Sequence, residues 1–346
     1  DSRTTEIRIN TTSSGAAIYK DVYDIPVLVR LDNTNFDFSE FGPNGDKAGL
    51  SFTRKGAPGK LPYQIDYWER NQAGIWVLLD TLKGNDDSQV IRMSWGEGYE
   101  NGSDGTKVFD VEKGFVGVWH LEESRPATGN QGLYQDATAN GYHGDDMVNT
   151  NTNDGLIGRG QYFGVAGMSY DWIRIPGNNN MGSNSSQISM ETWFNVTTAQ
   201  FFDRVFLSLG TTGTFEARFR VSLTSDWRIV LSARSSSPNT HSMSTEALPV
   251  SGGWHHLYCS VDYDADSMHV YLDGSLVRSA QVNLGDPLSA VTTIAAIGGE
   301  YNGMSGTFYG SLDEMRFSHA RRTPEWIKFC FENQKADSRV VQVGNR

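Results

Sequence analysis

The stretch Gly253–Val277, GWHHLYCSVDYDADSMHVYLDGSLV, sets the fold class of the chain. It holds three short segments rich in aromatic and β-branched residues, a composition typical of strands. Tyr263–Asp266 separates the first two segments, and the Asp273-Gly274 pair separates the last two. An Asp-Gly pair between apolar runs is a strong signal for a β-hairpin. The stretch therefore predicts consecutive antiparallel strands.

Similar short segments, separated by turn residues, fill the chain from residue 112 onward, and about ten of them at this spacing predict a two-sheet sandwich. The end of the chain differs. Thr323 is a good N-cap and Pro324 suits the first helical position. Three apolar residues then fall on one helical face, so we expect one short helix here: Trp326, Phe329 and Cys330.

The first part of the chain also has a strand pattern. Residues 4–12, TTEIRINTT, alternate apolar and polar side chains, and further short strands follow. Residues 97–110 are polar and rich in glycine, which is typical of a domain boundary. We expect an all-β protein with a small β-sandwich at 1–110 and a larger sandwich at 111–346.

Composition and charge exclude several classes of function. The 346 residues carry a formal net charge of −12, which repels phosphate and argues against nucleic-acid binding. No apolar run of 18 residues predicts a membrane span. Cys259 and Cys330 are too few for a disulfide framework or a cysteine-based zinc site. Two buried free thiols are favoured, and a single bridge remains the alternative.

Seven motifs in order give the second part of the chain a family resemblance. Together they resemble the laminin-G-like branch of the concanavalin A-like jelly rolls of bacterial surface proteins. The resemblance implies a two-sheet jelly roll with one short C-terminal helix. The motifs are VGVWHLEE (116–123), DATANGYHG (136–144), GRGQYFGV (158–165), METWF (190–194), GWHHLYCSVD (253–262), MHVYLDGSLV (268–277) and GSLDEMRFSHARRTPEWI (310–327).

The first part is similar to a small β domain of unassigned function. That domain often precedes such jelly rolls in bacterial proteins, including relatives of the MotA/TolQ/ExbB channels. The resemblance implies no defined activity. The matching segments are DIPVLVRLD (24–32), LPYQIDYWE (61–69) and WVLLDTL (76–82).

One polar stretch, QDATANGYHGDD at 135–146, offers oxygen ligands for a metal ion. Calcium takes six to eight oxygens, and Asp136 can supply a carboxylate and Asn140 an amide oxygen. The alternative is an Asx turn without metal. Asp145 and Asp146 are expected to be solvated surface charges.

The family resemblance implies a structural calcium ion at this loop. Its ligands would be Asp136, Asn140 and the late Asp313, with a backbone oxygen of Gly141 or His143. Glu122 would be a further candidate. His143 suits a carbonyl donor better than an imidazole ligand, because nitrogen is a poorer partner for calcium.

Catalytic signatures are missing from the sequence. Jelly-roll glucanases carry two glutamates in a motif of the form E-[ILV]-D-x-x-E, which retaining hydrolysis requires. Glu191 stands alone, and Glu314 has only Asp313 beside it. His120, His255 and His256 are expected to be structural, and no nucleophile elbow or P-loop occurs. We expect a protein that is not an enzyme.

Glycan binding requires exposed aromatic faces and a few polar groups. Arg218 and Arg220 alternate with apolar residues on one strand, and Trp227 follows it. These three side chains form a candidate platform, unless they pack inward. Three further aromatic residues are candidates for its rim: Tyr170, Trp172 and Tyr301.

Together these features predict a calcium-stabilised, non-catalytic module that binds a glycan or another surface ligand. The expected location is extracellular, at the cell surface, or periplasmic, with any signal peptide already removed. The alternatives are an envelope scaffold or adhesin that binds a protein partner of the ExbB/TolQ type, and a jelly-roll glycoside hydrolase.

Overall fold

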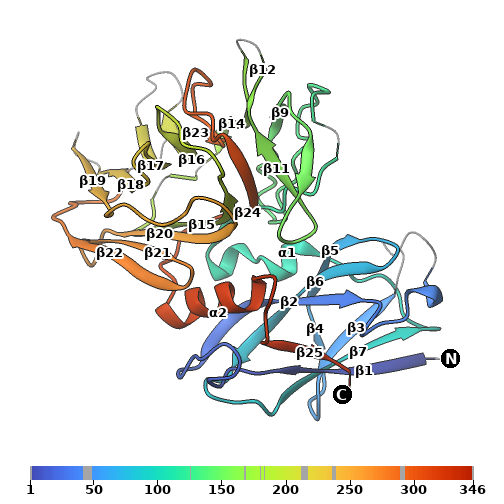
Figure 1. The fold of residues 1–346 in the computed structure, drawn as a ribbon. Helices are drawn as coiled ribbons and strands as arrows, with labels where there is room; N and C mark the ends of the chain where they lie inside the picture. Colours follow the sequence, from blue (N-terminus) through green and yellow to red (C-terminus); the bar gives the residue numbers. More distant parts are fainter. Residues whose placement is uncertain are drawn as a thin grey trace. The chain divides into compact units, whose positions relative to one another are not determined.

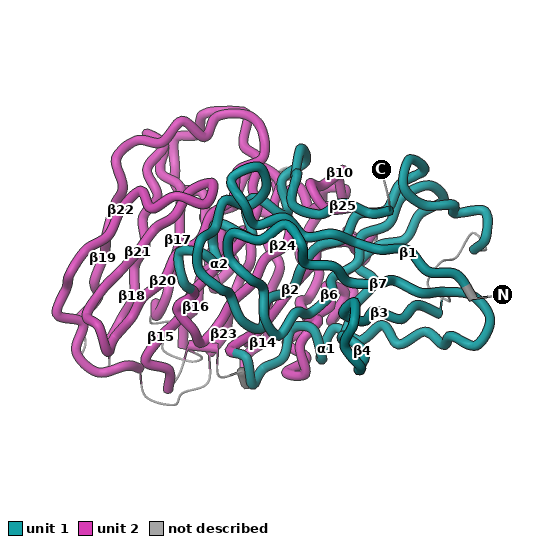
Figure 2. The backbone as a smooth tube through the Cα atoms, turned by 90° about the horizontal axis from the view of Figure 1, so that it is seen from below, with its two compact units in different colours: residues 1–113, 323–346 teal, residues 114–322 magenta. Residues whose placement is uncertain are grey.

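The computed structural model describes residues 2–41, 49–124, 126–166, 169–179, 181–182, 184–211, 217–235, 239–288 and 293–344. The chain divides into two compact units, coloured separately in Figure 2. Unit 1 comprises residues 1–113 and 323–346, and unit 2 comprises residues 114–322. Strands dominate both units, which confirms the all-β fold class (Figure 1).

Unit 1 contains two antiparallel sheets. The five-stranded sheet has the order β25 (Val341–Val343), β1 (Ser2–Ile9), β7 (Gln89–Gly96), β3 (Leu50–Arg54) and β4 (Lys60–Leu61). The three-stranded sheet has the order β2 (Val22–Asp32), β6 (Gln72–Leu82) and β5 (Tyr63–Trp68). The helical segments of unit 1 are short: η1 (Phe38–Glu40), α1 (Gly105–Val108), η3 (Val111–Lys113) and α2 (Pro324–Gln334).

Helix α2 forms as the local sequence predicts. The Thr323 hydroxyl accepts a hydrogen bond from the backbone N–H of Trp326, and Pro324 occupies the first turn. On strand β2, the backbone N–H of Leu28 donates to the side chain of Asn333, and the Asn333 amide donates back to the Leu28 carbonyl. This pair of bonds fixes α2 against β2 within unit 1.

The end of the chain belongs to a different unit from the one expected. Strand β25 pairs with β1 in the register Ile7 to Val343, so residues 323–346 group with unit 1. The larger sandwich had been expected to run from 111 to 346. The pairing joins residues more than 300 positions apart, and strand patterns do not encode such a partner.

Unit 2 contains two large antiparallel sheets. The eight-stranded sheet has the order β10 (Thr152–Asp154), β11 (Arg159–Phe163), β24 (Gly310–Ser318), β15 (Gln187–Asn195), β20 (Trp254–Asp262), β21 (Ser267–Leu272) and β22 (Ser275–Gln281), with β8 (Phe115–Trp119) also paired to β24. The seven-stranded sheet has the order β19 (Thr240–Ser244), β18 (Ile229–Arg234), β17 (Ala217–Leu223), β16 (Arg204–Thr211), β23 (Thr293–Ile297), β14 (Trp172–Asn179) and β9 (Asp145–Met147). A small sheet pairs β12 (Val165–Ala166) with β13 (Ser169–Tyr170).

The two large sheets of unit 2 enclose one hydrophobic core. Phe219 of β17 meets Phe317 of β24 edge to face, with 5.5 Å between ring centroids. Phe206 of β16 meets Phe194 of β15 in the same way at 5.1 Å. Inward-facing residues of both sheets thus interdigitate, as in a jelly-roll sandwich.

The opening stretch folds as its turn residues predict. Asp273 and Gly274 both have positive φ, and they form the two-residue turn between β21 and β22. The turn at Tyr263–Asp266 joins β20 to β21. Cys259 and Cys330 are both buried and form no disulfide bond with each other, which confirms the favoured prediction of two thiols.

Candidate functional site

The loop at 135–146 is organised around the Asp136 carboxylate, which is almost completely buried. One oxygen accepts from the backbone N–H groups of Val118 and Thr138, at 3.0 and 2.9 Å. The other accepts from the Thr138 hydroxyl at 2.9 Å and the Tyr142 N–H at 2.8 Å. Burial raises the pKa of Asp136, although these four donors oppose the shift. The carboxylate therefore joins β8 to the loop at 135–146 by hydrogen bonds.

Other residues expected around calcium also bond within the loop. The Asn140 side-chain amide donates to the Val116 carbonyl at 2.9 Å. The Gly141 carbonyl accepts from the backbone N–H of His143 at 2.8 Å. The imidazole Nδ1 of His143 accepts from the Asp136 N–H at 2.9 Å. Each of these contacts helps to close the turn.

Asp313 lies on β24 and is completely buried. One of its carboxylate oxygens accepts from the backbone N–H groups of Leu156 and Ile157, at 2.8 and 2.9 Å. Glu122 likewise accepts from the backbone N–H of Arg159 at 2.7 Å. The donors of Asp313 and Glu122 therefore come from the turn at 155–159, whereas those of Asp136 come from β8 and its own loop.

The expected calcium ligands do not fit a calcium ion in this arrangement. An ionised carboxylate has about four acceptor positions, and Asp136 already receives four donors. Among the described residues, neither Asp136 nor Asp313 belongs to a group of three or more acidic, histidine or cysteine side chains with ligand atoms within 4.8 Å of one another. The hydrogen bonds of this loop therefore fit the Asx-turn alternative better than a metal-binding loop.

The prediction that Asp145 and Asp146 are solvated surface charges is wrong. Their exposed fractions are only 5% and 4%. Asp145 forms an ion pair with Arg174 of the neighbouring strand, at 2.7 Å. Asp146 accepts hydrogen bonds from the backbone N–H groups of Thr128 and Gly129. Both partners are distant in sequence, so the local pattern of acidic residues did not reveal them.

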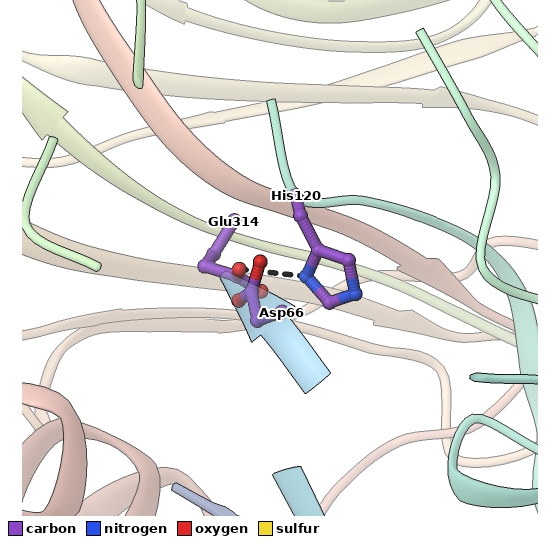
Figure 3. Close-up of side chains that lie close together, drawn as sticks. All are labelled: Asp66, His120 and Glu314. Carbon is purple, nitrogen blue, oxygen red and sulfur yellow. Dashed lines mark hydrogen bonds and ion pairs between the residues drawn. The ribbon is translucent and has the colours of Figure 1, made fainter. Parts of the chain in front are cut away.

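A row of buried charged side chains crosses the eight-stranded sheet. Glu191 on β15 contacts His256 at 3.0 Å and Arg316 at 3.8 Å. Arg316 also contacts Glu314 at 3.3 Å. Figure 3 shows the fifth member, His120, with its Nδ1 atom 2.7 Å from the Glu314 carboxylate. We call these five residues the charged row.

The pKa of Glu191 shows the effect of its neighbours in the charged row. Burial raises this pKa, but the charge of Arg316 and the hydrogen bond from His256 oppose it and lower the value to about 2. Glu191 is therefore ionised at neutral pH. The sequence did not reveal that Glu191 lies beside Arg316, because the pairing of β15 with β24 joins distant parts of the chain.

The candidate sugar platform is divided between two places. Arg218 and Arg220 line a small pocket of about 190 Å³ on β17 and β18. Arg218 is buried, and Arg220 forms ion pairs with Glu300 at 2.7 Å and Asp203 at 3.4 Å. Trp227 lies in the turn after β17, where it packs against the hydrophobic core. The three side chains thus do not form one platform.

The expected rim aromatics differ in accessibility. Tyr301 is buried, and its ring covers Gly210, where a Cβ atom would lie 2.4 Å from the ring. Tyr170 is 42% exposed and Trp172 is half-buried. Tyr170 and Trp172 both line a pocket of about 630 Å³, which we call the unit 2 pocket.

The unit 2 pocket also contains polar groups that the sequence analysis did not place among the ligand-binding residues. Thr128, Asp146 and Asn149 contribute to its lining, and Gly303 packs closely against Trp172. A Cβ atom at Gly303 would lie 2.4 Å from the Trp172 ring, so only glycine permits this approach. No local motif marks these residues, because they come from three separate segments of the chain.

Comparison with known proteins supports the fold of unit 2. A family model described as the concanavalin A-like lectin/glucanases superfamily matches residues 167–328. This range includes four of the seven motifs that carried the resemblance. The superfamily pattern and the two-sheet sandwich together confirm the expected jelly-roll class. No curated protein sequence gives a significant match.

Several solved structures are similar to part of the chain. The binding domain of Paraclostridial Mosquitocidal Protein 1 is 12% identical, with a TM-score of 0.49 over 64% of this chain and 53% of that one. Domain 4 of AbnA, an extracellular arabinanase from Geobacillus stearothermophilus in complex with arabinotriose, is 22% identical, with a TM-score of 0.44 over 62% of this chain and 97% of that one. The binding domain of Botulinum neurotoxin serotype D is 12% identical, with a TM-score of 0.46 over 64% of this chain and 51% of that one. The chain thus spans about half the length of the two toxin domains.

Proposed function

We propose that unit 2 is a non-catalytic module that binds a carbohydrate or another cell-surface ligand in the unit 2 pocket. The observation that carries this proposal is the position of Tyr170 and Trp172 on one pocket, beside the side chains of Thr128 and Asn149. Sugar rings stack on aromatic faces, and hydroxyl and amide groups fix their orientation. The match to a superfamily that includes lectins supports the same class of function.

The chemistry of the pocket supports a role without catalysis. Glycoside hydrolysis generally needs two carboxyl groups beside the scissile bond. Asp146 is the one acidic residue among the described residues that line the pocket, and it accepts hydrogen bonds from the loop at 128–129. Glu191 and Glu314 do not line this pocket, and both are engaged in the charged row.

Two expectations from the sequence, calcium stabilisation and the cellular location, also bear on the proposal. Calcium stabilisation remains a prediction from the resemblance, and the hydrogen bonds of Asp136 argue against an ion at that carboxylate. An extracellular or periplasmic location fits a ligand of the cell surface. No described helix has the length and hydropathy required to cross a membrane.

Binding of the complete chain to a glycan array tests the proposal. The strongest glycan is then titrated by calorimetry against the wild type, Tyr170→Ala and the control Tyr19→Ala. Tyr19 is 66% exposed, belongs to unit 1 and does not line the unit 2 pocket. We expect Tyr170→Ala to weaken binding about tenfold, which corresponds to about 1.4 kcal/mol. Equal affinity of Tyr170→Ala and the wild type contradicts the proposed site. An empty array, together with capture of an envelope protein, favours the scaffold alternative.

A further inference from the structure

Unit 1 contains a cluster of aromatic rings that the proposed function does not use. Phe36 contacts four of the rings, including Trp95 at 5.1 Å between centroids. Trp68 contacts Phe38 at 5.5 Å and Phe41 at 5.3 Å. The rings come from three segments: the region around η1, the end of β5, and β7, which contributes Trp95.

Three of these rings reach a pocket of about 890 Å³, which we call the unit 1 pocket. Phe38, Phe41 and Trp68 line it. Trp68 and Phe41 are half-buried, so parts of their rings face the open space, whereas Phe38 is buried. The pocket therefore has an apolar side made by aromatic rings on fixed secondary structure.

The ring geometry distinguishes between two classes of ligand. An aromatic cage for a quaternary ammonium group surrounds the cation with separate ring faces. Here Trp68 meets Phe38 at 65° and Phe41 at 64°, in direct edge-to-face contact. Such contacts leave no space for a cation between the rings. What remains accessible is the outer surface of the rings, which suits a flat ligand that stacks on them.

The polar residues of the pocket provide both hydrogen-bond donors and acceptors. Asp37 lies beside Phe38, and its pKa is lowered by hydrogen bonds from Ser39, so it is an ionised acceptor at neutral pH. Glu69 and Arg70 are exposed in the turn between β5 and β6. The Glu69 carboxylate accepts from the Gln72 amide at 2.7 Å, which holds this turn in place.

The charge of the site and of the chain restricts the ligand further. Asp37 and Glu69 outnumber Arg70, and the whole chain carries a net charge of −12. Both features repel anionic polymers. Sugar hydroxyls both donate and accept, so a neutral sugar satisfies carboxylate acceptors and the guanidinium donor together.

We propose that the unit 1 pocket is a second carbohydrate site, which binds a neutral polysaccharide by stacking a sugar ring on Trp68. Asp37, Glu69 and Arg70 bind the hydroxyl groups at its edge. This site lies entirely within unit 1 and does not depend on the unit 2 pocket. The chain is then a protein with two carbohydrate sites, one in each unit.

Affinity electrophoresis of the complete chain tests this proposal. Native gels contain one soluble neutral polysaccharide each: galactomannan, xyloglucan, arabinan, hydroxyethyl cellulose or starch. The variants are Tyr170→Ala, Trp68→Ala, Arg70→Ala and Tyr170→Ala/Trp68→Ala, with Tyr23→Ala as the matched control. Tyr23 is 61% exposed in unit 1 and does not line the pocket.

We expect at least one polysaccharide to retard the Tyr170→Ala variant, which lacks the exposed tyrosine ring of the unit 2 pocket. Trp68→Ala in that background should raise the dissociation constant about tenfold, and Tyr23→Ala should leave it unchanged. Trp68 also packs against its neighbouring rings, so thermal melts accompany each variant. Arg70→Ala removes an exposed side chain, and it tests the site even if Trp68→Ala does not fold.

Two results overturn the second site. One is that no polysaccharide retards Tyr170→Ala. The other is retardation that neither Trp68→Ala nor Arg70→Ala reduces. The proposed function of unit 2 fails separately, when Tyr170→Ala and the wild type have equal affinity for every polysaccharide and array glycan.

Discussion

The charged row and the unit 2 pocket show two different uses of polar residues within one unit. The charged row is buried, and its carboxylates contact Arg316 or a histidine. The pocket instead has exposed Tyr170 and half-buried Trp172 beside hydroxyl and amide groups. Glutamate and histidine residues in a sequence are candidates for catalysis, but those of the charged row form contacts with one another or with Arg316. The groups available to a ligand are instead two aromatic rings with hydroxyl and amide groups beside them.

Removing one charge from the row should have the largest effect on stability. Glu191→Gln removes the negative partner of the buried His256 and one of the two negative partners of the buried Arg316, and breaking a buried ion pair in this way costs about 3–5 kcal/mol. Urea unfolding followed by fluorescence measures the difference. Glu246→Gln is the control, because the Glu246 side chain is 87% exposed. A loss below about 1 kcal/mol would show that Glu314 alone compensates Arg316.

The same residue predicts how stability depends on pH. The pKa of Glu191 is about 2 in the folded chain, below its ordinary value of 4.5. For a carboxyl group with a lowered folded pKa, the stabilisation is complete above the unfolded pKa. It is lost as the pH falls from about 4.5 through 2. We expect the unfolding free energy of the wild type to decrease more steeply over this range than that of Glu191→Gln. Parallel pH profiles of the two proteins would contradict the lowered pKa.

Local chemistry was sufficient to predict parts of the fold. Asp273-Gly274 forms its turn and Thr323 caps its helix, because each depends on a few adjacent residues. Partners far along the chain were not predictable in this way. Asp145 looks solvated until β9 pairs with β14 and brings Arg174 beside it. In the same way, β25 belongs to unit 1 only through its pairing with β1.

The aromatic residues of the unit 2 pocket were also predictable only in part. Aromatic composition indicated Tyr170 and Trp172, which do line a pocket. It could not separate them from Tyr301, which covers Gly210, or from Trp227, which packs against the core. Strand alternation indicates which side of a strand a residue takes, but exposure also depends on the loops that cover that side.

Asp136 provides the second largest expected effect, and it tests the calcium prediction. Asp136→Ala removes an acceptor from four buried donors, which should cost about 2–3 kcal/mol in urea unfolding. Because those donors occupy the carboxylate, we also expect the same melting temperature in calcium and in EDTA. A calcium-dependent rise in the melting temperature that Asp136→Ala abolishes would show that the loop rearranges to bind the ion.

Asp146 should have a smaller effect, of about 1–2 kcal/mol on replacement by Ala. Its carboxylate accepts from the backbone of Thr128 and Gly129, which fixes the loop that borders the unit 2 pocket. Asp154→Ala is the matched control, because Asp154 is an exposed acidic residue of the same unit. Equal stability of the two variants would restore the expectation that Asp146 is replaceable.

Tyr170→Ala should have the smallest effect on stability, within about 0.5 kcal/mol. Its ring is 42% exposed and does not belong to the core of unit 2, so its removal leaves little unfilled volume. Glycan affinity should nevertheless fall, as measured by calorimetry. A large loss of stability would instead show that the ring supports the small sheet of β12 and β13, and the pocket would then need another aromatic contact for its ligand. A loss of stability in Glu191→Gln and a loss of glycan affinity in Tyr170→Ala would therefore separate the residues that maintain the fold from those that bind the ligand.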